Sequence, residues 1–173
     1  MKSILFTSDI SGLLLGKFSL VVVPRNRLMT WKVQTIIKQC EGKGIPIDVH
    51  NPENELFCFN EGLESYSYIK KVGPDIGISW FYTQLFPPEI LSLFPRGILN
   101  FHAGPAGAHA LYRAIKGGDK EIRCFWHWVD EGVDTGPVVV EDTIPLPTIF
   151  DTARIALICA GIKMFKDIES CIS

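Results

Sequence analysis

The sequence predicts an α/β fold, with an open, mostly parallel sheet, helices on both faces and an antiparallel edge, in a single domain over residues 1–173. Apolar, β-branched stretches alternate with stretches of helical spacing, which is the pattern of parallel strands joined by helices. The last two predicted strands have no helix between them, which favours an antiparallel pair. A hydrophobic fraction of 47% indicates a globular protein with a substantial core.

Seven stretches are predicted strands because they are apolar or β-branched and end at proline, glycine or a polar residue. They are residues 3–9, 19–24, 45–50, 75–81, 97–102, 122–130 and 136–146. Residues 51–62 are polar and are predicted to form a loop. The turn between the last two strands is short, which makes them the predicted antiparallel edge.

Five stretches are predicted helices from their apolar spacing and from the residues at their ends. They are residues 28–44, 64–73, 87–95, 109–118 and 150–170. Gly42 and Gly44 end the first helix, a proline opens the third, and Asp151 is a candidate N-cap for the last. The segment between the first two strands is short for a helix.

Charge and composition argue against several classes of function. The net charge of −2 gives no basic surplus for binding nucleic acid. The most apolar stretch, residues 12–24, contains Lys17 and is too short to span a bilayer, and no signal peptide is recognised, so we expect a cytoplasmic protein. The five cysteines are scattered and predict reduced thiols without a zinc site. No glycine-rich nucleotide loop follows the first strand.

The stretch GILNFHAGPAGAH, residues 97–109, carries the first candidate for chemistry. Asn100 and His102 point to the same face of their strand because strand side chains alternate. They lie at its carboxyl end, where open α/β sheets bind ligands. An amide and an imidazole there can bind a developing negative charge and move a proton. The alternative is that both only cap the strand end.

A second candidate is the acidic turn in HWVDEGVDTGPVV, residues 127–139. It places Asp130, Glu131 and Asp134 between two apolar strands. An aspartate beside a histidine orients the imidazole and favours its protonated form. A solvated acidic hairpin turn is the alternative.

These motifs resemble those of the folate-dependent formyltransferases, which include methionyl-tRNA, glycinamide ribonucleotide and sugar N-formyltransferases and a related deformylase. The family's Asn-x-His pair is similar to Asn100 and His102. Its HFVDEGVDTGP stretch is nearly reproduced by residues 127–137, which places the family's catalytic aspartate at Asp134. SWFYTQLFPPEIL, residues 79–91, resembles the family's Tyr-Gly-Gln-Ile-Leu-Pro loop. The resemblance is clear from about residue 75 to 150 and implies the family's Rossmann-like sheet.

The resemblance implies an enzyme of one-carbon metabolism that transfers a formyl group from 10-formyltetrahydrofolate to a primary amine. Asn100 and a protonated His102 would stabilise the oxyanion, and Asp134 would pair with His102 and order the water that relays the amine's proton. No metal site is expected, because no two cysteines or histidines have the spacing of metal ligands. The residues expected to hold the folate are Tyr82, Gln84, Leu85, Phe86, Asp130, Glu131 and Val133.

The resemblance weakens at residues 103–109, where the loop is about five residues shorter than in the family, as surface loops tolerate. This change could move the acceptor pocket. His109 in this region is expected to face solvent, and His127 to pack as a core or edge histidine.

The molecule that accepts the formyl group is inferred by elimination. The chain has no basic surplus and ends soon after its last predicted helix, which argues against tRNA, so a small-molecule amine such as a nucleotide-linked amino sugar is expected. Three alternatives stay open: hydrolysis of 10-formyltetrahydrofolate, an activity like that of methionyl-tRNA formyltransferase, and a catalytically silent folate-binding module. A homo-oligomer is compatible with the sequence, and neither a membrane nor a nucleic acid is an expected partner.

Overall fold

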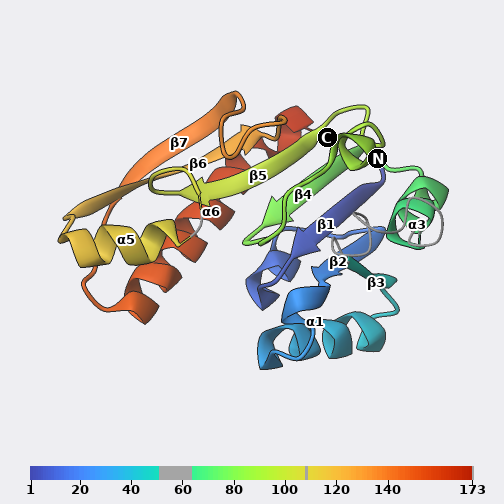
Figure 1. The fold of residues 1–173 in the computed structure, drawn as a ribbon, viewed down its shortest axis with the longest axis horizontal. Coiled ribbons are helices and arrows are strands. Elements are labelled where there is room, and N and C mark those ends of the chain that lie inside the picture. The colour runs from blue at the N-terminus through green and yellow to red at the C-terminus, as the bar shows by residue number, and fades with distance from the viewer. Residues whose placement is uncertain (51–63, 108, 173) are drawn as a thin grey trace. The chain divides into compact units, whose positions relative to one another are not determined.

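The computed structural model describes residues 1–50, 64–107 and 109–172 (Figure 1). Within these residues, seven strands form a sheet in the order β3-β2-β1-β4-β5-β6-β7. The chain divides into two compact units, Met1–Ile98 and Leu99–Ser173, which are described separately. The polar loop predicted at residues 51–62 lies outside the described residues.

The first unit contains a parallel sheet of β1 (Ser3–Thr7), β2 (Leu20–Pro24), β3 (Ile47–His50) and β4 (Ile76–Trp80). β1 pairs with β2 and with β4, β2 pairs with β3, and every pair is parallel. All five residues of β2 and of β4 are buried. Continuous apolar runs are typical of parallel strands because helices cover both faces of such sheets.

The helices of the first unit are shorter than the sequence predicts. They are the 3-10 turns Ile10–Leu14 and Arg25–Arg27, and the α-helices α1 (Trp31–Gly42), α3 (Glu64–Val72) and α4 (Pro88–Leu91). α1 begins three residues later than predicted because the side chain of Thr30 accepts a hydrogen bond from the Val33 N–H and caps it there. α4 is a single turn, and residues 92–97 continue as tight turns with i to i+3 hydrogen bonds.

The second unit contains the antiparallel strands. They are β5 (Ile98–Ala103), which belongs to this unit from Leu99 onward, β6 (Glu121–Trp128) and β7 (Val138–Pro145). β6 is antiparallel to both β5 and β7. The helices of the unit are α5 (Ala110–Gly117) and α6 (Phe150–Ile172). The predicted fold class, a mostly parallel α/β sheet with an antiparallel edge, is confirmed.

The long helix α6 covers β6 and closes the core of the second unit (Figure 1). The Trp126 indole N–H donates to the Gly161 carbonyl oxygen over 3.0 Å, and the rings of Trp126 and Phe165 lie 5.1 Å apart. Leu157 and Met164 are buried on the same helix. Although α6 is long, none of the described helices has the length and apolar character needed to cross a membrane.

Candidate functional site

Strand β5 presents Asn100 and His102 together, as the alternation of its side chains predicts. Phe101, between them, is buried against Trp126 with ring centroids 5.4 Å apart. In the register with β6, Asn100 lies opposite His127 and His102 lies opposite Phe125. The Phe125 ring lies 5.6 Å from the His102 ring and 5.4 Å from the His127 ring. The two strands therefore bring one amide and two imidazoles to one face.

Asp134 joins this group from the loop after β6. Its backbone φ is 55°, in the left-handed region that aspartate adopts more readily than most residues. Its Oδ2 lies 3.3 Å from His102 Nδ1 and accepts a hydrogen bond from the Gly107 N–H over 2.9 Å. Its Oδ1 accepts a hydrogen bond from Asn100 Nδ2 over 3.4 Å. The structure thus brings Asn100, His102 and Asp134, the three predicted catalytic residues, into one network within the second unit.

His127 is a fourth member of the network that the sequence interpretation did not include. It is buried, as expected for a core histidine, with 2% of its side chain exposed. Its Nε2 lies 3.0 Å from Asn100 Nδ2 and 3.7 Å from Asp134 Oδ1. Its Nδ1 lies 3.0 Å from the Trp128 carbonyl oxygen. His127 is identified by the register of β5 and β6, which places it opposite Asn100. The sequence does not specify this register, so no sequence signal pointed to His127.

The surroundings of His127 set its protonation. Burial lowers the pKa of the His127 imidazole, while the hydrogen bond to the Trp128 carbonyl and the charge of Asp134 act against that shift. A neutral ring that donates from Nδ1 to this carbonyl has an acceptor at Nε2. Asn100 Nδ2 can therefore donate one hydrogen to Nε2 and its other hydrogen to Asp134 Oδ1, because ionised carboxylate oxygens only accept. We assign the amide orientation of Asn100 on this basis.

This arrangement uses both amide hydrogens of Asn100. The bond to Asp134 is the longer of the two, at 3.4 Å against 3.0 Å to His127, and is long for an N–H···O contact. Asn100 can therefore turn one hydrogen toward a developing oxyanion by releasing Asp134, while His127 holds the other.

His102 has an acceptor at each ring nitrogen. Nδ1 faces Asp134 Oδ2 over 3.3 Å, and Nε2 faces the Pro105 carbonyl oxygen over 3.2 Å. A ring protonated on both nitrogens satisfies both acceptors by donating twice. Both His102 and Asp134 are only 14% exposed, so water screens their contact weakly. His109, by contrast, is exposed, as expected, and precedes α5 with a φ of 59°.

The loop after β4 contains four of the residues expected to hold folate. The rings of Tyr82 and Phe86 stack with centroids 5.4 Å apart, and both lie edge-on to Phe6, so these two rings pack within the first unit. Leu85 is 70% exposed. Gln84 accepts a hydrogen bond from the Tyr82 hydroxyl, but its Nε2 is buried with no hydrogen-bond partner in the described part of the chain. The exposed side chain of Leu85 is available as an apolar surface for a flat ligand such as a pterin ring.

The remaining expected folate residues lie in the loop between β6 and β7. Asp130 Oδ1 accepts hydrogen bonds from the Gly132 N–H over 3.0 Å and from the Thr135 hydroxyl over 2.8 Å, so this oxygen closes its own turn. Glu131 is exposed. Val133 is 47% exposed and is available as an apolar wall. This loop fits a ligand through Val133 and its backbone more readily than through Asp130.

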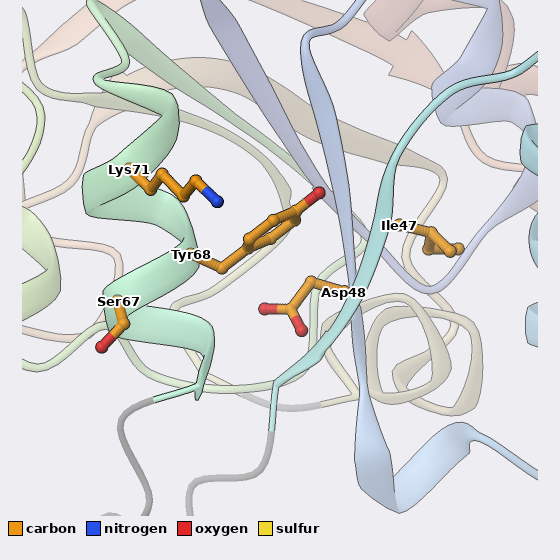
Figure 2. A pocket seen from close by; sticks show the side chains of 5 residues that line it. All are labelled: Ile47, Asp48, Ser67, Tyr68 and Lys71. Carbon is orange, nitrogen blue, oxygen red and sulfur yellow. The ribbon is translucent and has the colours of Figure 1, made fainter.

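A separate pocket of the first unit lies between β3 and α3 (Figure 2). Its volume is about 410 Å³, and it is lined by Ile47, Asp48, Ser67, Tyr68 and Lys71. Figure 2 shows the Asp48 carboxylate and the Lys71 ammonium on opposite sides of the Tyr68 ring. None of these described lining residues belongs to the predicted site. In the described chain, no group of three or more histidine, cysteine, aspartate or glutamate residues could hold a metal ion.

Comparison with known proteins identifies the family to which the chain is similar. A family model described as formyl transferase matches residues 33–154, more than half of the chain. Methionyl-tRNA formyltransferase of Acidithiobacillus ferrooxidans is 33% identical over 135 residues, which are 76% of this chain and 41% of that protein. The chain thus spans less than half the length of this relative.

Solved structures extend the likeness to the fold. Phosphoribosylglycinamide formyltransferase from Bacillus halodurans superposes with a TM-score of 0.78 at 18% identity, covering 97% of this chain and 95% of that one. The same enzyme from Streptococcus pneumoniae gives a TM-score of 0.77 at 18% identity, covering 99% of each chain. With the family model matching residues 33–154, the chain belongs to the formyl transferase family of folate-dependent enzymes.

Proposed function

We propose that this chain transfers a formyl group from 10-formyltetrahydrofolate to a primary amine. The observation that carries the proposal is the network in the second unit that joins Asn100, His102 and Asp134. Membership in the formyl transferase family supports the formyl donor. Within the second unit, the exposed side chain of Val133 is available to a folate ring.

His102 is the proton donor in this proposal. Bound 10-formyltetrahydrofolate would supply an electrophilic formyl carbon. His102 Nε2–H would leave the Pro105 carbonyl and donate to the formyl oxygen as negative charge develops there. Asp134 Oδ2 would accept a hydrogen bond from His102 Nδ1–H and so fix the orientation of the ring. Removing one such donor typically slows a reaction by about 100- to 1000-fold.

Asn100 would supply a second hydrogen-bond donor to the formyl oxygen; it contacts Asp134 Oδ1, whereas His102 contacts Oδ2. One amide hydrogen stays on the neutral Nε2 of His127, which prevents the amide from flipping. The other hydrogen, held over 3.4 Å by Asp134, would turn to the same formyl oxygen. Asp134 Oδ1 is then free to accept a proton from the attacking amine, directly or through a water molecule. The bond from the formyl carbon to N10 would then break, N10 would take the proton that Asp134 accepted, and tetrahydrofolate would leave. The formyl oxygen would return its proton to His102 as the carbonyl re-forms.

The acceptor class is part of the proposal. The sequence-based choice of a nucleotide-linked amino sugar rests on elimination. The relatives are named for methionyl-tRNA, which is already an open alternative, and for phosphoribosylglycinamide, which is a further candidate. All three present a primary amine, which is the chemistry the network can serve.

The test is product analysis by mass spectrometry. Purified chain is incubated with 10-formyltetrahydrofolate and each of three amines: a nucleotide-linked amino sugar, glycinamide ribonucleotide and methionyl-tRNA. A fourth reaction contains no amine. We expect a formylated amine in at least one reaction. Formate released equally in all four would replace the transferase with a hydrolase, and unchanged 10-formyltetrahydrofolate in all four would contradict both activities.

Two histidine variants provide a matched pair for this test. His102→Asn removes the proposed donor, and His109→Asn changes an exposed histidine of the same unit. Asparagine tolerates the left-handed backbone at residue 109. We expect His102→Asn to lose at least about 100-fold in turnover and His109→Asn to match the wild type. Equal turnover in the two variants would contradict the role of His102.

A further inference from the structure

The short turn after β5, Gly104–Gly107, contacts the network at two points. The Pro105 carbonyl oxygen lies 3.2 Å from His102 Nε2, and the Gly107 N–H donates to Asp134 Oδ2 over 2.9 Å. Gly104 and Gly107 have φ values of 85° and 93°, which only glycine adopts readily. The conformation of this turn therefore decides what His102 and Asp134 face.

Arg113 on α5 holds this turn in place. Its Nη2 donates to the Pro105 carbonyl oxygen over 3.0 Å and to the Ala106 carbonyl oxygen over 2.9 Å. The buried residues Ala110 and Ala114 anchor α5 in the second unit, so the helix fixes the position of the Arg113 backbone. A guanidinium nitrogen carries two hydrogens in one plane and can serve two adjacent carbonyls at once.

We propose that Arg113 is a positioning residue for formyl transfer: by holding the carbonyls of Pro105 and Ala106, it sets the turn that orients His102 and Asp134. This inference rests on the function proposed above. Arg113 does not touch the reacting atoms in this scheme. It acts through Pro105, whose carbonyl oxygen it shares with His102 Nε2, and through Gly107, whose N–H fixes one oxygen of Asp134.

The consequence is a selective loss of turnover when Arg113 is removed. A loosened turn lets Asp134 and the His102 ring adopt other orientations, and small misplacements of reacting groups slow reactions by about tenfold to 100-fold. The KM for 10-formyltetrahydrofolate should change little, because Arg113 acts on the turn at residues 104–107, which contains none of the residues expected to hold the folate. Arg113→Lys should recover part of the loss, since one ammonium can reach a carbonyl but lacks the planar pair of donors.

The experiment compares Arg113→Met with Lys116→Met. Lys116 lies on the same helix, is exposed, and loses the same charge when replaced. Turnover is measured with 10-formyltetrahydrofolate and the amine that serves the wild type. In parallel, the ring nitrogens of His102 and the amide of Gly107 are followed by NMR on ¹⁵N-labelled, unliganded protein. The His102 signals are assigned with the His102→Asn variant.

We expect Arg113→Met to shift the His102 and Gly107 signals and to lower kcat, while Lys116→Met does neither. Unshifted signals in Arg113→Met would overturn the proposal. Shifted signals with wild-type kcat would overturn it too, because the contact would then be structural only. A wild type that consumes no 10-formyltetrahydrofolate would overturn the proposed function. In that case the NMR spectra still decide whether Arg113 positions His102, because they need no substrate.

Discussion

Asp134 accepts hydrogen bonds from two segments of the second unit. Asn100 and His102 come from β5, and the Gly107 N–H comes from the turn that follows it. His102 and Gly107 share Oδ2, while Asn100 reaches Oδ1. At the scale of single residues, both oxygens of this carboxylate are engaged, so a change of one oxygen into an NH₂ group must place a donor against a donor.

Asp134→Asn should therefore slow formyl transfer by at least about 100-fold. Asparagine keeps the shape and tolerates the left-handed backbone of residue 134, so the loop should keep its conformation. Folate affinity should change little, because Asp134 is not among the residues expected to hold the ring. The measurement is kcat and the Kd for folate in the wild type and in Asp134→Asn. Asp119→Asn, an exposed acid of the same unit, is the control. Equal kcat in the two variants would refute the catalytic role.

His127 should make the stability of the protein depend on pH. Burial lowers the pKa of its imidazole below the ordinary value of 6.5, so the unfolded ring takes up a proton at a higher pH than the folded ring. Its contribution to stability is present above pH 6.5 and is lost as the pH falls below that value toward the lowered pKa.

The check is urea unfolding of the wild type and of His127→Gln between pH 8 and pH 5, a range chosen to bracket about one unit or more around the histidine pKa. A glutamine oxygen can accept the hydrogen bond from Asn100 and does not titrate. We expect the wild type to lose more unfolding free energy than the variant across this range. Parallel curves for the two proteins would contradict the lowered pKa.

At the scale of elements, the loop between β6 and β7 positions Asp134 because its backbone packs closely on the end of β6. A Cβ atom at Gly136 would overlap the Trp128 carbonyl oxygen, and the neighbouring backbone N–H of Asp130 would lie 3.4 Å from it. The loop can keep this path only with glycine at residue 136. The β6–β7 register also shifts at Trp126/His127, where the strand leads into this loop.

Gly136→Ala should displace this loop, destabilise the protein by about 1–3 kcal/mol and lower turnover by moving Asp134. Gly42→Ala is the matched control, since no atom lies within 4 Å of a Cβ there and its φ is not positive. The control should be neutral or stabilising by up to about 1 kcal/mol, because alanine favours helix. Urea unfolding and turnover measure both effects. An unchanged midpoint and kcat in Gly136→Ala would show that the loop adapts without moving Asp134.

The elements themselves show which sequence signals are dependable. The seven strands lie within two residues of their predicted bounds, because their apolar and β-branched runs are short and are bounded by proline, glycine or polar residues. The predicted helix 87–95 shortened to Pro88–Leu91. Proline at residue 95 disfavours helical backbone at the residue before it, and the chain there takes tight turns instead.

At the scale of the whole molecule, binding of a reduced folate should raise the unfolding free energy of the full chain. A ligand that binds only the folded state at 100 times its Kd adds about 2.7 kcal/mol. Thermal unfolding with increasing 5-formyltetrahydrofolate measures this better than tryptophan quenching. The nearest tryptophan to the expected folate loop, Trp80, is fully buried and its indole N–H donates to Ser11 Oγ. A midpoint that does not move at millimolar folate would contradict the proposed donor. Buffer that contains glutamate and no folate is the control.

The sequence by itself determined the alternation of strands and helices, the common face of Asn100 and His102, and the family motif that contains Asp134. These follow from local patterns, since a strand's period of two places alternate side chains without reference to the rest of the chain. The prediction of a single domain over residues 1–173 stays a prediction.

Only the tertiary structure decided that His127 lies opposite Asn100, that the Pro105 carbonyl faces His102, and that Arg113 reaches back to the same turn. Each of these contacts depends on strand register or on the path of a short loop. Both are set by the packing of segments distant in sequence, because a shift of one residue in register would turn His127 to the opposite face.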